Sequence, residues 1–281
     1  MFGDVIVPLD GGEEAARALG PARKIAEYLE SPLRIVAYHE LGSDGVDLEQ
    51  QVQRNLKTLD GADYTLSVEA IDGSVAAALG VELEAHPSAL VVMSTHGRGR
   101  SAAFIGSVAN DLLHVATGPV LLVGPKANLN VFRLDGPMIV AVEESEHAVA
   151  VLPIAESFSI VFGYSPEVVE VLTPEEMEDL QTAQIAGLSG DFPLESAGVQ
   201  RAAAAVKQAI GRDVNFEILH DKNPAKALVE YAKFRNAPLI AMATHAPSGM
   251  SRLSHGSVTA DTVADAPCPV LAIRPPDFVE G

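Results

Sequence analysis

The sequence predicts an α/β protein built from two tandem copies of one domain, each an open five-stranded parallel sheet flanked by helices, arranged as an intramolecular pseudo-dimer. Three observations predict this: the chain has 281 residues, its halves repeat one another, and short apolar runs alternate with helical patterns. The length suits about two domains. With 48% apolar and 20% charged residues, the composition is that of a folded globular chain.

The internal repeat fixes the domain division. The stretches "GSVANDLLHVATGPVLLVGP" (106–125) and "GSVTADTVADAPCPVLAIRP" (256–275) agree at nine of twenty positions without a gap, whereas average composition predicts roughly one or two matches. We therefore expect a first domain at 1–127 and a second at 136–276.

Each element of the first copy follows from its local pattern. A helix is expected at 13–30, because Glu13 and Glu14 suit the positive end of a helix dipole and Pro32 follows the helix end. Another is expected at 107–116. Apolar and β-branched runs predict strands at 4–9, 33–39, 64–70, 89–94 and 119–123. Strands that alternate with helices indicate a parallel sheet covered on both faces.

The second copy carries a longer insert at 172–211. Thr173, Pro174 and Glu175 predict a helix start there, as a cap, a proline in the first position and an acidic first turn. The sequence assigns no chemical role to this insert.

The last strand of each copy has apolar side chains on both faces. An unpaired edge strand attracts pairing with another chain. We expect strands 119–123 and 269–273 to pair across a pseudo-twofold axis within the chain.

Charge and cysteine content limit the function classes. A formal net charge of −19 disfavours nucleic acid and anionic membranes as partners. No targeting segment and no apolar run of transmembrane length is recognised, so a cytoplasmic location is expected. Cys268 is the sole cysteine, so no internal disulfide can form, and burial should raise its thiol pKa.

A glycine-rich loop follows the strand at 89–94, at the sheet edge where α/β proteins bind ligands. Its glycines, and the helix start at Gly106 and Ser107, suit a phosphate group, while Asp10 suits a sugar or base. A glycine-rich turn with a serine cap is also common without any ligand. The chain lacks the P-loop pattern GxxxxGK[ST], and Ala102 breaks the dinucleotide pattern GxGxxG.

The order "VIVPLDGG", "VVMSTHGRG" and "GSVANDLLHVATGPVLLV" resembles the universal stress protein family over nearly the whole chain, as two tandem copies. Nucleotide-binding members carry G-x2-G-x9-G-[ST], with an aspartate ending the first strand. The resemblance implies a fold like that of the adenine nucleotide alpha hydrolases, ATP or AMP as ligand, with Mg²⁺ only alongside ATP, and domain pairing through the last strands.

The family's binding residues carry over by position. Pro8 and Asp10 would meet the adenosine, and Met93 would lie near the base. The phosphates would be held by Gly97, Arg98, Gly106, Ser107 and Val108. The second-copy equivalents are Gly256 and Ser257.

Departures from the motif predict that the two sites differ. Ser94 stands at the first glycine, and eight residues rather than nine separate Gly97 from Gly106. Glu40 occupies an apolar contact position, which would put a carboxylate beside an anionic ligand unless it turns outward. In the second copy, alanines replace both leading glycines, at 243 and 246, and Glu143 replaces the aspartate.

Three functions are weighed. The leading one is a cytosolic stress-response protein whose first copy binds adenine nucleotide as a regulatory ligand. The alternatives are a nucleotide-free scaffold and an uncharacterised α/β hydrolase or transferase. No metal site is expected, since His96 and His245 are equivalent repeat positions and no HxH or HxxxH pattern occurs. Without a positioned base, lysine or metal carboxylate, any ATP hydrolysis should be slow.

Overall fold

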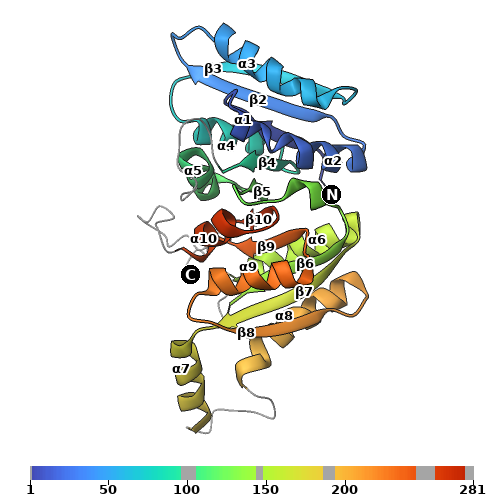
Figure 1. Ribbon diagram of the computed structural model, residues 1–281, viewed down its shortest axis with the longest axis vertical. Helices are drawn as coiled ribbons and strands as arrows, with labels where there is room; N and C mark the ends of the chain where they lie inside the picture. The colour runs from blue at the N-terminus through green and yellow to red at the C-terminus, as the bar shows by residue number, and fades with distance from the viewer. Residues whose placement is uncertain (1, 96–105, 144–147, 186–193, 245–256, 276–281) are drawn as a thin grey trace.

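The computed structural model of the protein describes residues 2–95, 106–143, 148–185, 194–244 and 257–275. In these residues the strands form a single ten-stranded sheet in the order β3-β2-β1-β4-β5-β10-β9-β6-β7-β8 (Figure 1). The first copy contributes β1 (Val5–Pro8), β2 (Leu33–Glu40), β3 (Tyr64–Ile71), β4 (Leu90–Ser94) and β5 (Val120–Val123). The second contributes β6 (Gly136–Val142), β7 (Tyr164–Leu172), β8 (Asn215–His220), β9 (Leu239–Ala243) and β10 (Val270–Ile273). The five strands predicted for the first copy are confirmed, each end to within one residue.

The two copies join through their last strands. Within each copy neighbouring strands are parallel, whereas β5 and β10 are antiparallel, with Leu121 opposite Leu271. Leu121, Leu122 and Leu271 are fully buried. The pairing closes the edge that each copy would otherwise expose, and the predicted pseudo-dimer is confirmed.

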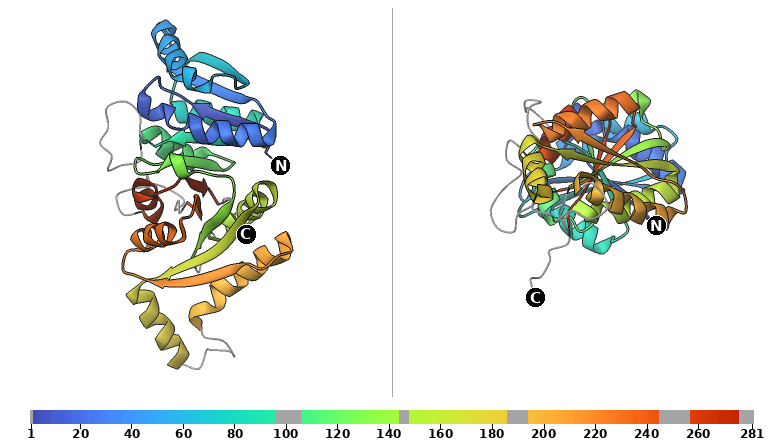
Figure 2. Two further views of the ribbon diagram at one scale, coloured as in Figure 1. Left: turned by 45° about the vertical axis from the view of Figure 1, so that its right-hand side comes forward. Right: turned by 90° about the horizontal axis from the view of Figure 1, so that it is seen from below.

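Helices cover both faces of the sheet (Figure 2). One core layer packs beneath α1 (Glu13–Ala16), α2 (Leu19–Leu29), α3 (Val46–Leu56), α6 (Leu152–Phe162) and α8 (Leu194–Ile210). The opposite layer packs beneath α4 (Val75–Ala85), α5 (Ser107–Val115), α9 (Pro224–Arg235) and α10 (Val258–Asp265). Short 3₁₀ turns lie at η1 (Lys57–Leu59), η2 (Leu129–Val131) and η3 (Ala148–Val151). None of the described helices is long and apolar enough to cross a membrane.

The prediction of a single helix at 13–30 was wrong. The chain forms α1 and α2, separated by a turn at Arg17 and Ala18, whose amides bond three residues back, to Glu14 and Ala15. Pro21 has no N–H to donate to the carbonyl of Arg17, so the regular helical bonding is interrupted there. The predicted helix at 107–116 is found as α5, one residue shorter.

The insert of the second copy forms α7 (Pro174–Ile185) and leads into α8. Its predicted start is confirmed: the Glu176 amide donates to Thr173 Oγ1 at 3.4 Å, and the Thr173 amide donates to Glu176 Oε2 at 2.7 Å. This reciprocal pair is a capping box. α8 covers β7 and β8, while α7 packs against α8 and extends past the β8 edge (Figure 1).

The connection between the copies is held by the first copy's helices. Arg17 donates to the carbonyls of Pro125 at 3.1 Å and Ala127 at 2.9 Å, and Lys24 donates to the carbonyl of Phe132 at 2.7 Å. These charged donors satisfy carbonyls that flank η2 in the connecting segment.

Candidate functional site

A cleft of about 250 Å³ opens at the carboxyl ends of β1 and β4. Strand order reverses there, because β2 lies on one side of β1 and β4 on the other. Such a reversal point is where open α/β sheets bind ligands. Six of the residues predicted from the sequence line the cleft together: Pro8, Asp10, Met93, Gly106, Ser107 and Val108.

The remaining predicted residues do not line this cleft in the described part of the structure. Gly97, Arg98 and Gly256 lie outside the described residues, as do His96 and His245. Ser257 is described and lies at the start of α10. The binding role of all the predicted residues stays a prediction.

Sequence reasoning missed about half of the lining. Tyr38 comes from β2, whose carboxyl end lies beside β1, and Val75 opens α4. Tyr38 lies two residues before the end of β2 and Val75 lies four residues after the end of β3, so their place in the cleft depends on how β2 and α4 pack. The further lining residues are Leu9, Ala15, Ser94, Thr95 and Ala109.

The start of α5 supplies the cleft's unbonded main-chain donors. The amide of Gly106 is taken, since it donates to the carbonyl of Thr95 at 2.6 Å, and the first helical bond runs from Asn110 to the Gly106 carbonyl at 3.0 Å. Between them, the amides of Ser107, Val108 and Ala109 have no side-chain cap. Amides in a first helical turn favour an anion.

Glycine is required at position 106 for a steric reason. A Cβ atom there would lie 2.6 Å from the carbonyl oxygen of Thr95. No side chain fits without moving the backbone that closes the loop. From the sequence, this glycine was expected to let the backbone approach a phosphate. The structure adds a second reason for glycine: it allows the close contact between Gly106 and the carbonyl of Thr95.

Asp10 is fixed at the rim of the cleft. Its Oδ1 accepts from the amide of Gly12 at 2.8 Å, and Gly11 between them has a φ of 79°, in the left-handed region that favours glycine. The carbonyl of Gly12 accepts from the Asn55 side chain at 3.2 Å. The turn after β1 therefore orients a carboxylate at the cleft in advance of any ligand.

The Tyr38 ring forms one wall, and its hydroxyl is buried. Burial raises the pKa of this hydroxyl above its ordinary value, and the carboxylates of Glu82 and Glu69 raise it further. Tyr38 therefore stays protonated near neutral pH and is no general base there.

The expected conflict with Glu40 does not arise in the cleft. Glu40 is exposed at the end of β2 and is not among the lining residues. His39 beside it bonds Ser43 Oγ at 3.0 Å and packs against Gly45, as a residue of the outer rim. The described cleft is not closed by a carboxylate from this strand.

The equivalent helix start in the second copy is capped by the protein itself. α10 begins one residue later in the repeat than α5, and the hydroxyl of Ser257 accepts from the amide of Ala260 at 3.0 Å. Glu143, in place of Asp10, is exposed. Ala260 is the repeat equivalent of Asn110, whose amide bonds the Gly106 carbonyl in the first copy, so the described difference between the two helix starts is that the Ser257 hydroxyl is used as a cap.

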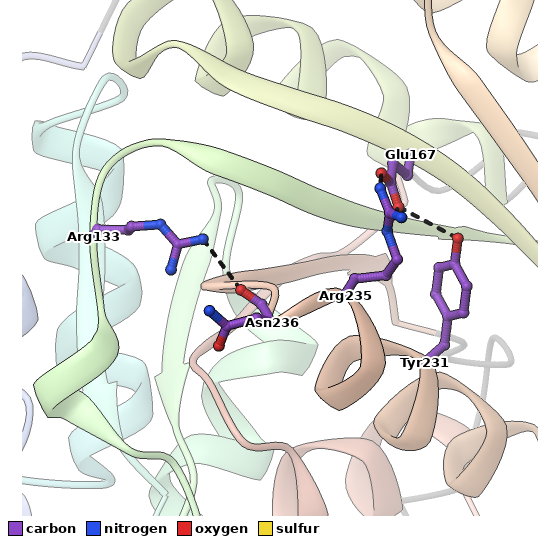
Figure 3. Close-up of polar contacts among 5 residues, drawn as sticks. All are labelled: Arg133, Glu167, Tyr231, Arg235 and Asn236. Atoms are coloured by element: carbon purple, nitrogen blue, oxygen red, sulfur yellow. Dashed lines mark hydrogen bonds and ion pairs between the residues drawn. The ribbon is translucent and has the colours of Figure 1, made fainter.

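A second polar cluster lies between β7 and α9 and has a structural role. Glu167 is 4% exposed, and Arg235 holds it through two bonds, one of them from Nε at 2.8 Å (Figure 3). The Tyr231 hydroxyl donates to the same carboxylate at 3.4 Å, and Arg133 bonds the carbonyl of Asn236 nearby. The hydrogen bonds that Arg235 donates to Glu167 raise the pKa of Arg235, so its guanidinium stays charged.

Metal-ligating and thiol side chains also occur within the described part of the chain. Among the described residues no three histidine, cysteine or acidic side chains group to hold a metal ion. Cys268 is buried, and burial raises its thiol pKa to about 12, as expected.

Comparison with known proteins identifies relatives of both halves. The model of the family described as "Universal stress protein family" matches residues 1–124 and 136–274. A universal stress protein of Methanocaldococcus jannaschii is 40% identical over 53 residues, which cover 19% of this chain and 31% of that protein. The match thus spans less than a third of that relative's length.

Solved structures share the fold over the whole chain. A protein of unknown function from Pseudomonas aeruginosa PAO1 superposes with a TM-score of 0.65 at 15% identity, covering 98% of this chain and 93% of that one. A universal stress protein from Archaeoglobus fulgidus gives 0.62 at 17% identity, covering 96% and 98%. At this identity the likeness shows the fold.

Proposed function

The chain belongs to the universal stress protein family, and from that premise we propose that its first copy binds an adenine nucleotide, ATP or AMP, as a regulatory ligand in a cytoplasmic stress response. Mg²⁺ would accompany ATP alone. The second copy acts as the structural partner that completes the ten-stranded sheet.

One observation carries the proposal: a cleft at the switch point of the sheet brings together an apolar wall, an oriented carboxylate and the uncapped start of a helix. These are the three kinds of group that a base, a ribose and a phosphate require. In the described part of the second copy, the Ser257 hydroxyl is used as a cap and Glu143 is exposed, and we therefore place the nucleotide in the first copy.

The ligand is proposed as a signal and not as a substrate in rapid turnover. Efficient phosphoryl transfer uses a lysine or arginine, a metal and a positioned base. Among the described residues that line the cleft there is no lysine or arginine, and Tyr38 stays protonated. Hydrolysis, if measured, should be slow.

Isothermal titration of ATP and AMP into the full-length protein tests the proposal. Ser107→Asp puts a carboxylate in the first turn of α5, where the helix dipole favours it, so the fold is retained while a phosphate is repelled. Asn223→Asp is the matched control, because Asn223 caps α9 in the second copy and takes the same charge change.

Equal nucleotide affinity in the wild type and in Asn223→Asp, with an affinity about tenfold weaker in Ser107→Asp, would support the site. Absence of binding heat in the wild type at millimolar nucleotide would contradict the proposed nucleotide site and favour the nucleotide-free scaffold. Turnover that persists in Asp10→Ala and Ser107→Ala would point instead to an enzyme acting elsewhere in the chain.

A further inference from the structure

We infer that the cleft of the first copy selects a nucleoside with one phosphate group over the corresponding triphosphate. The inference rests on the proposed function and concerns the charge of the ligand. It follows from three features of the described site: the number of anion donors, the inventory of charges and the apolar walls.

The donors at the start of α5 match one phosphate. Three amides, those of Ser107, Val108 and Ala109, precede the first helical bond without a side-chain cap, and the Ser107 hydroxyl adds a fourth donor. A phosphate monoester offers three acceptor oxygens. The amide of Gly106, the residue before this turn, is already bonded to the carbonyl of Thr95.

The described charges give additional phosphates nothing to pair with. Asp10 and Tyr38 are the ionisable residues that line the described cleft, and the chain as a whole carries a formal charge of −19. Arg17 follows the lining residue Ala15 by two positions, yet its guanidinium bonds the carbonyls of Pro125 and Ala127. Each further phosphate therefore adds repulsion without a described cation to offset it.

The rest of the cleft suits a nucleoside. Leu9, Tyr38, Val75, Met93 and Val108 form apolar walls around a space of about 250 Å³. Cavities for drug-sized ligands range from roughly 300 to 1,000 Å³, so this one suits a small ligand. An apolar body with one anionic end is the complementary shape.

Titration of adenosine, AMP, ADP and ATP into the full-length protein, without Mg²⁺ and at low salt, tests the inference. We expect AMP to bind tightest and ATP at least about tenfold more weakly, with ADP between them, because charge repulsion grows along the series. Added salt should narrow the ratio of AMP to ATP affinity, since it screens that repulsion. Ser107→Asp should weaken AMP by about tenfold and leave adenosine nearly unchanged.

The outcomes separate this inference from the proposed function. If ATP binds as tightly as AMP or more tightly, the charge argument is overturned while nucleotide binding stands. If none of the four ligands binds, both fail. Arg98 lies outside the described residues, so the series is repeated with Arg98→Gln: the preference for AMP should persist, and an ATP affinity that equals AMP in the wild type and collapses in this variant would locate the missing cation.

Discussion

The starts of α5 and α10 differ although both helices begin within the same triplet, Gly-Ser-Val. Each follows the equivalent strand of its copy, β4 ending at Ser94 or β9 ending at Ala243. In α10 the serine hydroxyl caps the helix, whereas in α5 the serine is already helical and the amides stay uncapped. The cap bonds the amide of Ala260, whose first-copy equivalent Asn110 bonds the Gly106 carbonyl, so the described difference lies in the serine hydroxyl, which accepts a hydrogen bond at Ser257 and caps no amide at Ser107.

The comparison depends first on the antiparallel pairing of β5 with β10, which joins the two copies in one sheet. We expect the largest loss of stability from a substitution in this pairing. Leu122→Lys puts a charge into the fully buried β5–β10 pairing. We expect a loss of at least about 3 kcal/mol in the free energy of unfolding, because an unpaired buried charge is expensive. Urea unfolding measures it.

Val115→Lys is the control for this change, since Val115 is 43% exposed on α5 of the same copy. It should alter stability by less than about 0.5 kcal/mol. Equal stability of Leu122→Lys and the wild type would mean that β5 and β10 do not pair as described.

The second prediction compares two ion pairs whose strand residues occupy equivalent positions. Glu167 pairs in register with Ile139, as Arg34 does with Ile6, so the two copies carry opposite charges at one place. Arg235→Ala leaves the buried Glu167 carboxylate unpaired and should cost about 1–3 kcal/mol.

The first-copy pair sharpens this comparison. Arg34 and Glu82 lie 3.7 Å apart with partly exposed side chains, so Glu82→Ala should cost no more than about 1 kcal/mol. Thermal or urea unfolding of the two variants decides it. A larger loss for Glu82→Ala than for Arg235→Ala would contradict the buried-charge argument.

The third prediction bears directly on the two serines. Ser257→Ala removes a cap and should lower the free energy of unfolding by about 1 kcal/mol. Ser107→Ala removes no cap, so stability should change by less than about 0.5 kcal/mol, while AMP affinity falls. Urea unfolding and AMP titration of both variants measure this. A larger loss of stability in Ser107→Ala than in Ser257→Ala, or a loss of AMP affinity in Ser257→Ala alone, would contradict the comparison.

The sequence predicted most of the fold because its signals are local. The strand bounds follow from apolar runs, and the α7 start from Thr173 and its neighbours. The break before α2 was missed although Pro21 signals it, because the acidic start and terminal Pro32 suggested one uninterrupted helix.

The site was predicted only in part, for a physical reason. Residues from the motif follow from position, but Tyr38 enters the cleft through the packing of β2 beside β1, which sequence spacing does not show. Nor does the shared triplet reveal that Ser257 caps its helix while Ser107 does not.

The smallest expected effect concerns Gly118, the first-copy counterpart of Cys268. A Cβ at Gly118 would meet the Ala89 carbonyl at 3.5 Å and Leu83 at 4.0 Å, which are ordinary contacts. Its φ lies outside the left-handed region, so Gly118→Ala is compatible with the fold and should raise the free energy of unfolding by about 0.4–1 kcal/mol, by reducing the freedom of the unfolded chain. Cys268→Ala should instead lower it, because the buried sulfur leaves a cavity. Urea unfolding of both variants measures this. A lower free energy of unfolding for Gly118→Ala would mean that a methyl group at this position does not fit the first copy.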